Sequence, residues 1–342
     1  MSGEASPHRG PSIAWFALGY FATYVPYSAL TKALSDGLFR GGPLPGLALL
    51  PVSNVASMLS MVAFLSAAGW WRYAGRGSLF GFELPRPGPW TFLSGLATAA
   101  VVVTTTLAYT FQGASIVFMM LLMRGGVLVL APAVDLATGR PVRWFSWLAL
   151  ALSLASLLAA FVGRPGFGLS ALAALDVAVY LAAYFVRLRL MSRLAKADDP
   201  ALSRRYFVEE QMVATPAVVL ALAALALAGP AAVAAPLGQG FTSLGSPSVW
   251  LLVALVGALS QGNGIFGGLV LLDRRENSFC VPINRASSML AGLGATLLLW
   301  ALLGEAPPSP GELAGALLVA VALGALSLPD VLSSWWAGRR AA

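Results

Sequence analysis

Two arginines lie within apolar stretches of the chain, where a permanent charge is destabilising. Arg124 interrupts SIVFMMLLMRGGVLVLAP, and Arg285 lies in a second such stretch, VPINRASSMLAGLG. An arginine at the centre of a membrane-spanning helix costs about 2.5–3.5 kcal/mol on insertion scales. A planar guanidinium forms paired hydrogen bonds with a carboxylate or phosphate. We therefore expect both side chains to face the interior of a helical bundle and to hold an anionic or zwitterionic substrate between them.

Other polar side chains recur at helical spacing in the apolar stretches. In the first apolar stretch of the chain, residues 12–35, Tyr20, Tyr24 and Tyr27 are three or four residues apart, which places them on one helix face. The stretch SQGNGIFGG adds amide side chains among glycines, and we expect it to be locally unwound. The substrate-binding residues that we expect are Arg124, Arg285, Asn284, Tyr24, Tyr27, Tyr180, Gln261 and Asn263.

Asp176 is the carboxylate that we expect nearest the middle of the membrane, four residues before Tyr180. One interpretation is a fixed ion pair with Arg124 or Arg285. The other is a titratable coupling group whose protonation accompanies substrate movement. Burial favours the neutral acid and a nearby guanidinium favours the carboxylate, so the sequence leaves both open. Asp135 lies near the cytoplasmic end of its expected helix, and we expect no special role for it.

Composition limits the class of protein. Of the 342 residues, 58% are hydrophobic and 10% are charged, whereas soluble domains carry about 25% charged residues. The single histidine, His8, lies in the polar N-terminal segment, and the single cysteine, Cys280, cannot form an intramolecular disulfide. These residues leave no metal site and no Ser–His or Cys–His dyad within the membrane, and no phosphate-binding P-loop motif is present. We expect an integral membrane protein that is not an enzyme and has no cofactor.

Apolar segments of about 20 residues are long enough to cross a bilayer as helices. Basic residues are concentrated in alternate connections, sixteen on one side against three on the other, so the positive-inside rule predicts that both termini are cytoplasmic. The net charge of +7 thus reflects topology and not a nucleic-acid partner. We expect an uncharged loop between residues 229 and 247. The ten expected spans are 12–35, 46–70, 89–111, 114–135, 144–162, 167–192, 207–229, 248–272, 279–303 and 310–332.

The spans that contain Arg124 and Arg285 are the fourth and the ninth. Because an odd number of helices separates equivalent positions, equivalent helices run in opposite directions, which is typical of an inverted-topology repeat. We therefore expect an all-α membrane protein with a first repeat over residues 1–163 and a second over 164–342. The excess of arginine over lysine favours a bacterial inner-membrane protein.

Three segments resemble the drug/metabolite transporter superfamily. LLGEAPPSPGELAGALLVAVALGALSL resembles the motif that closes each repeat, and ATGRPVRWFSWLALALSLASLLAAF occupies the matching place in the first half. ASIVFMMLLMRGGVLVLAP resembles the fourth helix of the EamA-like, nucleotide-sugar and chloroquine-resistance-type branch of this superfamily. The resemblance implies ten helices in two inverted halves around a central cavity with alternating access.

The function that we expect is secondary transport of a small polar, anionic or zwitterionic metabolite, by export, import or exchange. The expected partners are this substrate, the lipid bilayer and a coupling proton or counter-substrate, and no nucleic acid; a homodimer is left open. One alternative is proton-driven export of amphipathic compounds. Another, from a different class, is a non-transporting membrane assembly partner or a lipid-modifying enzyme.

Overall fold

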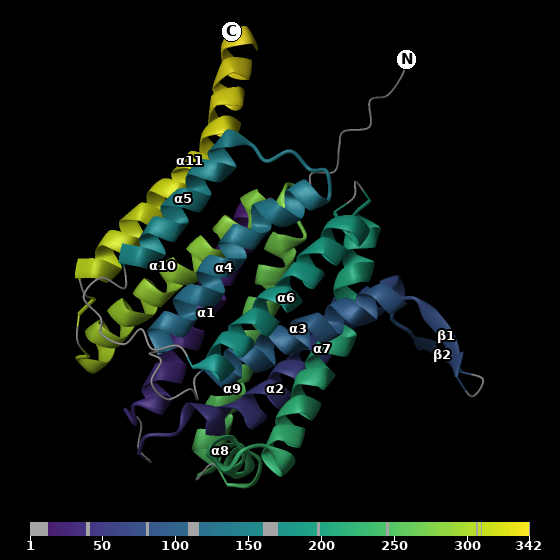
Figure 1. Cartoon of the computed structure of the whole chain (residues 1–342), viewed down its shortest axis with the longest axis vertical. Helices are drawn as coiled ribbons and strands as arrows, with labels where there is room; N and C mark the ends of the chain where they lie inside the picture. Colours follow the sequence, from purple (N-terminus) through teal and green to yellow (C-terminus); the bar gives the residue numbers. More distant parts are fainter. Residues whose placement is uncertain are drawn as a thin grey trace.

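The computed structural model describes residues 13–38, 42–79, 82–108, 116–159, 170–196, 199–243, 246–305, 307–308 and 310–341. Within these residues the chain is a bundle of α-helices with one small β-hairpin (Figure 1). The first half contains α1 (Ile13–Ser35), α2 (Gly46–Ala67), the short 3₁₀ helix η1 (Trp70–Tyr73), β1 (Arg76–Leu79), β2 (Phe82–Pro85), α3 (Pro89–Ala108), α4 (Ile116–Ala137) and α5 (Trp144–Ala159). The second half contains α6 (Ala171–Leu194), α7 (Pro200–Ala228), α8 (Ala231–Thr242), α9 (Pro247–Leu271), α10 (Asn277–Leu303) and α11 (Pro310–Ala341).

In the part of the chain that the structure describes, five helices are long and apolar enough to cross a membrane: α2, α6, α7, α9 and α10. The helices α3, α5 and α11 contain shorter apolar stretches. Each of the ten expected spans overlaps a helix, although α7 begins at Pro200, earlier than expected. The helical fold is therefore confirmed, and the long apolar helices indicate an integral membrane protein, since a helix satisfies its own backbone groups within a single span.

The helices pack in a layered arrangement in which α1 contacts α9 and α10, and α3 contacts α6 and α7. Helix α2 contacts both α7 and α9, while α5 lies along α11 at one side of the bundle (Figure 1). Small residues make the closest crossings: a Cβ atom at Gly257 of α9 would lie 2.1 Å from the carbonyl oxygen of Ser53 on α2. Such contacts are typical of membrane helices, whose association depends on close van der Waals packing.

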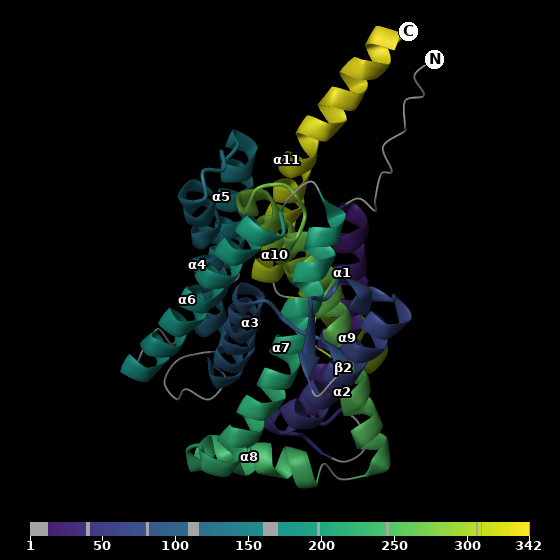
Figure 2. The ribbon, with the colours of Figure 1, turned by 90° about the vertical axis from the view of Figure 1, so that its right-hand side faces the viewer.

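Two local expectations are wrong. The expected loop before residue 247 contains α8, which buries Val233 and Leu237 and lies at the end of the molecule opposite the C-terminus of α11 (Figure 2). The SQGNGIFGG stretch is part of the continuous helix α9. Its glycines allow close packing instead of unwinding, because a Cβ at Gly262 would lie 2.8 Å from Cγ2 of Thr23.

Candidate functional site

Arg285 is the charged residue at the centre of the candidate site. Its side chain projects from α10, is 9% exposed and donates a hydrogen bond from Nη2 to the hydroxyl oxygen of Tyr184 on α6 at 2.7 Å. Its Nε is buried and has no hydrogen-bond partner among the described residues, and no carboxylate of these residues forms an ion pair with it. A buried guanidinium with an unused donor is a site for an anion.

Arg124 approaches the same region from α4. Its Nη2 donates a hydrogen bond of 3.3 Å to the hydroxyl oxygen of Tyr24 on α1. Tyr24 packs edge-to-face on Tyr20, with ring centres 5.5 Å apart, and Tyr20 interacts electrostatically with both Arg285 and Arg124. Both arginines thus contact tyrosines that lie close together.

The tyrosines form what we call the tyrosine cluster: Tyr20, Tyr24, Tyr180 and Tyr184. Tyr180 and Tyr184, one helical turn apart on α6, have ring centres 5.0 Å apart. Tyr27 continues the stack on α1, at 5.5 Å from Tyr24. The rings offer apolar faces together with hydroxyl groups that can donate or accept, so the cluster suits an organic ligand better than an inorganic ion.

A cavity of about 270 Å³ adjoins this cluster. Arg285 lines it together with Tyr20 and Tyr184, and the three expected amides also line it. Gln261 accepts a hydrogen bond from Ser57 at 2.7 Å, Asn263 accepts one from Thr23 at 2.7 Å, and Asn284 donates one to the carbonyl of Gly267 at 3.2 Å. Amide side chains therefore line the same cavity as the guanidinium of Arg285. Arg124, Tyr24 and Tyr180 are not among the residues that line it.

A buried ion pair that was not predicted from the sequence lies beside the cavity. Arg187 of α6 donates from Nε and Nη2 to the two carboxylate oxygens of Glu210 on α7, at 2.8 and 3.1 Å. Ser94 and Thr98 of α3 also donate to Glu210, each at 2.9 Å. Arg187 is one of the sixteen basic residues that the positive-inside rule assigns to the cytoplasmic side, but its side chain lines the cavity. The Arg187–Glu210 pair is neutral as a whole. Of the two arginines that line the cavity, Arg285 is therefore the one without an ion pair among the described residues.

A larger chamber of about 840 Å³ adjoins the cavity, and both are lined by Asn54, Val101, Val102 and Ser260. Tyr27 and Thr31 line the chamber, as do Gly46 at the start of α2 and Pro236 of α8. Since α8 lies opposite the C-terminus of α11, the chamber is at that end of the molecule (Figure 2). The chamber thus lies between the α8 end and the cavity that Arg285 lines, and its lining is mainly apolar.

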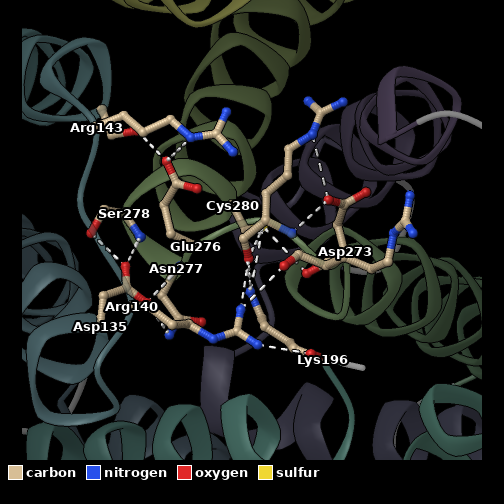
Figure 3. Close-up of polar contacts among 12 residues, drawn as sticks. Asp135, Arg140, Arg143, Lys196, Asp273, Glu276, Asn277, Ser278 and Cys280 are labelled. Atoms are coloured by element: carbon tan, nitrogen blue, oxygen red, sulfur yellow. Dashed lines mark hydrogen bonds and ion pairs between the residues drawn. The ribbon is translucent and has the colours of Figure 1, made fainter. Parts of the chain in front are cut away.

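Polar contacts join the helices at the opposite end, which we call the polar junction: Asp135, Arg140, Ser192, Lys196, Asn277 and Ser278 (Figure 3). Asp135 of α4 is fully buried and accepts hydrogen bonds from the backbone nitrogens of Asn277 and Ser278, at 2.9 and 2.7 Å. Asn277 Nδ2 and Ser278 Oγ also donate to it, at 2.8 and 2.6 Å. Asp135 therefore caps the first turn of α10, which has no side-chain cap of its own.

Arg140 and Lys196 extend the junction to α6 and to the turn between α9 and α10 (Figure 3). Arg140 donates to the carbonyl of Lys196 at 2.8 Å and to that of Arg274 at 3.1 Å. Lys196 Nζ donates to the carbonyl of Arg275 at 2.9 Å. The expectation that Asp135 needs no special account is wrong, because its carboxylate provides a helix cap from a different helix.

Asp176 is buried, with 6% of its surface exposed, and its Oδ2 has no hydrogen-bond partner in the described part of the chain. It forms no ion pair there with Arg124 or Arg285, so the fixed-pair interpretation is wrong for this conformation. Arg124 donates a hydrogen bond to Tyr24, and Arg285 donates one to Tyr184. A buried carboxyl without a cation is easier to accommodate as the neutral acid, which leaves the titratable interpretation open.

The polar residues of α2 were also missed. Asn54 and Ser57 line the cavity, and Gln211 of α7 lies in its wall. Their sequence signal is weak, because isolated polar residues in apolar helices commonly bond to their own backbone, as Asn54 does to the carbonyl of Leu50 at 2.9 Å. The acidic pair in RRYFVEEQM was a stronger signal for Glu210.

A scan against protein-family models finds no match, and no curated protein matches the chain. A solved structure described only as "Crystal structure of protein" has a similar fold. The two superpose with a TM-score of 0.59 over 93% of this chain and 99% of the other, at 17% sequence identity. At this identity the likeness concerns the fold alone.

Proposed function

We propose that the chain is a secondary transporter of a small organic anion or zwitterion, and a member of the drug/metabolite transporter superfamily that its motifs resemble. The observation that carries the proposal is the unneutralised guanidinium of Arg285, 9% exposed at the wall of a cavity of about 270 Å³. An anionic group would offset its charge, and the tyrosine cluster and the facing amides would bind the organic part.

The helix pairings support two inverted five-helix repeats. If α1 to α5 correspond to α6, α7, α9, α10 and α11, then the contact of α1 with α9 corresponds to that of α6 with α3. The contact of α2 with α9 likewise corresponds to that of α7 with α3, and α4 contacts α10 as its own counterpart. In this interpretation α8 is an insertion in the second repeat, and all ten remaining helices cross the membrane.

Access to the site differs at the two ends, which supports alternating access. The chamber leads toward Arg285 from the α8 end, while the polar junction ties α4, α6 and α10 together at the other end. With both termini in the cytoplasm, as loop charges predict, this conformation would be open outward. Release to the cytoplasm would require Asp135 to leave the first turn of α10.

A flux assay in proteoliposomes loaded with a pooled metabolite extract tests this function. Fractions of the extract separated by charge are offered from outside, and uptake is measured by mass spectrometry. We expect saturable exchange confined to the anionic and zwitterionic fractions, and none with Arg285→Gln. Exchange of the cationic fraction alone would refute the anion site, and no exchange of any fraction would favour a non-transporting protein.

A further inference from the structure

The β1–β2 hairpin and its surroundings form a feature that the proposed function does not use. The hairpin connects η1, which follows α2, with the start of α3, and it projects sideways beyond the helical bundle (Figure 1). It lies at the end of α2 that is opposite the chamber, since the chamber is lined by Gly46 at the start of that helix. A segment between the ends of two membrane helices lies at the level of the bilayer surface.

The hairpin has one apolar and one polar face. In the antiparallel register Gly77 pairs with Leu84 and Leu79 pairs with Phe82, so these four positions share a face. Phe82 is 72% exposed and Leu84 is 47% exposed, which leaves their apolar surface uncovered by the described chain. The other face carries Arg76, Ser78, Glu83 and Pro85, and Arg76 lies 3.8 Å from Glu83.

The hairpin is held firmly to the bundle. Glu209 of α7 is 1% exposed and accepts hydrogen bonds from the backbone nitrogens of Gly75 and Gly88, both at 2.9 Å. Thr91 donates to the same carboxylate at 2.5 Å, and Arg205 at 2.7 Å. Because one buried side chain binds both ends of the hairpin, its apolar face keeps a fixed orientation relative to α7.

Basic and aromatic side chains surround the apolar face. A Cβ atom at Gly77 would lie 2.7 Å from Cδ of Arg86, so the aliphatic part of Arg86 lies over Gly77 on this face. At the base of the hairpin, hydrogen bonds from Arg72 and Arg204 lower the pKa of the Tyr73 phenol, which indicates a positive local field. Trp90, at the start of α3, is 60% exposed, as is typical of aromatic residues at the membrane interface.

We propose that the β1–β2 hairpin is an interfacial anchor whose apolar face, Phe82 and Leu84, enters the surface of an acidic phospholipid bilayer while the neighbouring arginines bind lipid phosphate. The surface of a bilayer has acyl chains below anionic headgroups. Apolar side chains can enter the acyl region while arginines beside them bind the headgroups. If the apolar face instead bound a second copy of the chain, the arginines around it, Arg72, Arg86 and Arg204, would have no role in that contact.

Site-directed fluorescence in vesicles tests the anchor. A single label is placed at Phe82→Cys or, as the matched control on the polar face, at Ser78→Cys, with Cys280→Ala removing the native thiol. The protein is reconstituted in phosphatidylcholine with and without phosphatidylglycerol. Quenching is measured with nitroxide-labelled lipid and with aqueous iodide.

We expect the label at position 82 to be quenched by the lipid nitroxide and protected from iodide, and the label at 78 to show the reverse. Phosphatidylglycerol should strengthen lipid quenching at 82, and Arg86→Gln should reduce that gain. Equal iodide quenching at both positions would overturn the anchor. Quenching at 82 that is independent of phosphatidylglycerol and of Arg86 would overturn its acidic-lipid part. Protection of position 82 in lipid-free detergent that grows with protein concentration would point instead to a second copy and would also overturn the proposal.

Discussion

The guanidinium of Arg285 is held by one aromatic side chain, Tyr184. Nη2 donates to the phenol oxygen at 2.7 Å, and the guanidinium carbon lies 5.3 Å from the centre of the same ring. This arrangement orients the charge without neutralising it, because a phenol is a neutral acceptor. It differs from Arg187, whose charge is matched by Glu210 at 2.8 Å. One buried arginine is thus paired with a carboxylate, and the other has only a neutral hydrogen-bond partner among the described residues.

The Arg187–Glu210 pair is expected to be essential for stability. Glu210→Gln removes the negative charge and leaves the guanidinium of Arg187 buried without a counter-charge. Such a change lowers the free energy of unfolding by about 3–5 kcal/mol. Thermal unfolding in detergent measures the effect. The control is Glu83→Gln, which removes an exposed pair with Arg76 and should cost about 1 kcal/mol or less. Equal melting temperatures for the two variants would show that the buried pair does not stabilise the bundle.

Asp135 is expected to keep the polar junction closed. In Asp135→Asn an amide NH₂ group faces the N–H and O–H donors of Asn277 and Ser278, which then lose an acceptor. The free energy of unfolding should fall by about 1–3 kcal/mol. Cys280, the single cysteine, is fully buried near Lys196 and reports opening through its rate of alkylation by maleimide. We expect faster alkylation in Asp135→Asn than in the wild type.

The matched control for this variant is Asp199→Asn, which alters the exposed cap of α7. It removes a carboxylate from another helix start, where Ala201 N donates to Asp199 at 2.8 Å. Alkylation of Cys280 should not change in this variant. If Asp135→Asn also left the alkylation rate at the wild-type value, Asp135 would have no part in closing this end.

Asp176 is expected to affect coupling and not the fold. Asp176→Asn retains the shape of a side chain whose Oδ2 has no partner among the described residues, so thermal stability should change by about 1 kcal/mol or less. Transport driven by a pH gradient should be lost in this variant, while exchange of substrate for substrate continues. Transport that still responds to the pH gradient would exclude Asp176 as the coupling group.

The ten-span topology is tested by reporter fusions. Reporters placed after Arg86, Lys196 and Arg340 should score as cytoplasmic, and one near Gln239 in α8 should score as external, because the basic connections lie on one side. The measurements are the enzymatic activity of a fused phosphatase and the fluorescence of a fused fluorescent protein at each position. A cytoplasmic score at Gln239 would be incompatible with two inverted repeats.

Much of the helical architecture was predictable, because apolar length alone locates membrane helices. The shared helix face of Tyr20, Tyr24 and Tyr27 was also predictable from their spacing, but the approach of α6, which completes the tyrosine cluster, was not. The partners of charged residues were not. Asp135 and Asn277 are far apart in the sequence, and their contact depends on how α4 meets α10.

The hairpin and α8 were missed for different reasons. The hairpin is a short segment whose ends are fixed by Glu209, a contact with a distant helix that carries no local signal. The segment of α8 contains Pro236 and glycines, which favour a loop locally, and the burial of Val233 and Leu237 outweighs that preference.

The most direct test of the account is substrate affinity in proteoliposomes, measured by counterflow of the anionic metabolite fraction for wild type, Arg285→Lys and Arg285→Gln. Lysine keeps the charge but loses the planar donor pair, so binding should weaken about tenfold or more, whereas glutamine should nearly abolish transport. Arg124→Lys and Arg124→Gln should follow the same order, and all four variants should insert and purify like the wild type. Saturable transport of a purely cationic substrate, unaffected by Arg285→Gln and Arg124→Gln, would contradict the account.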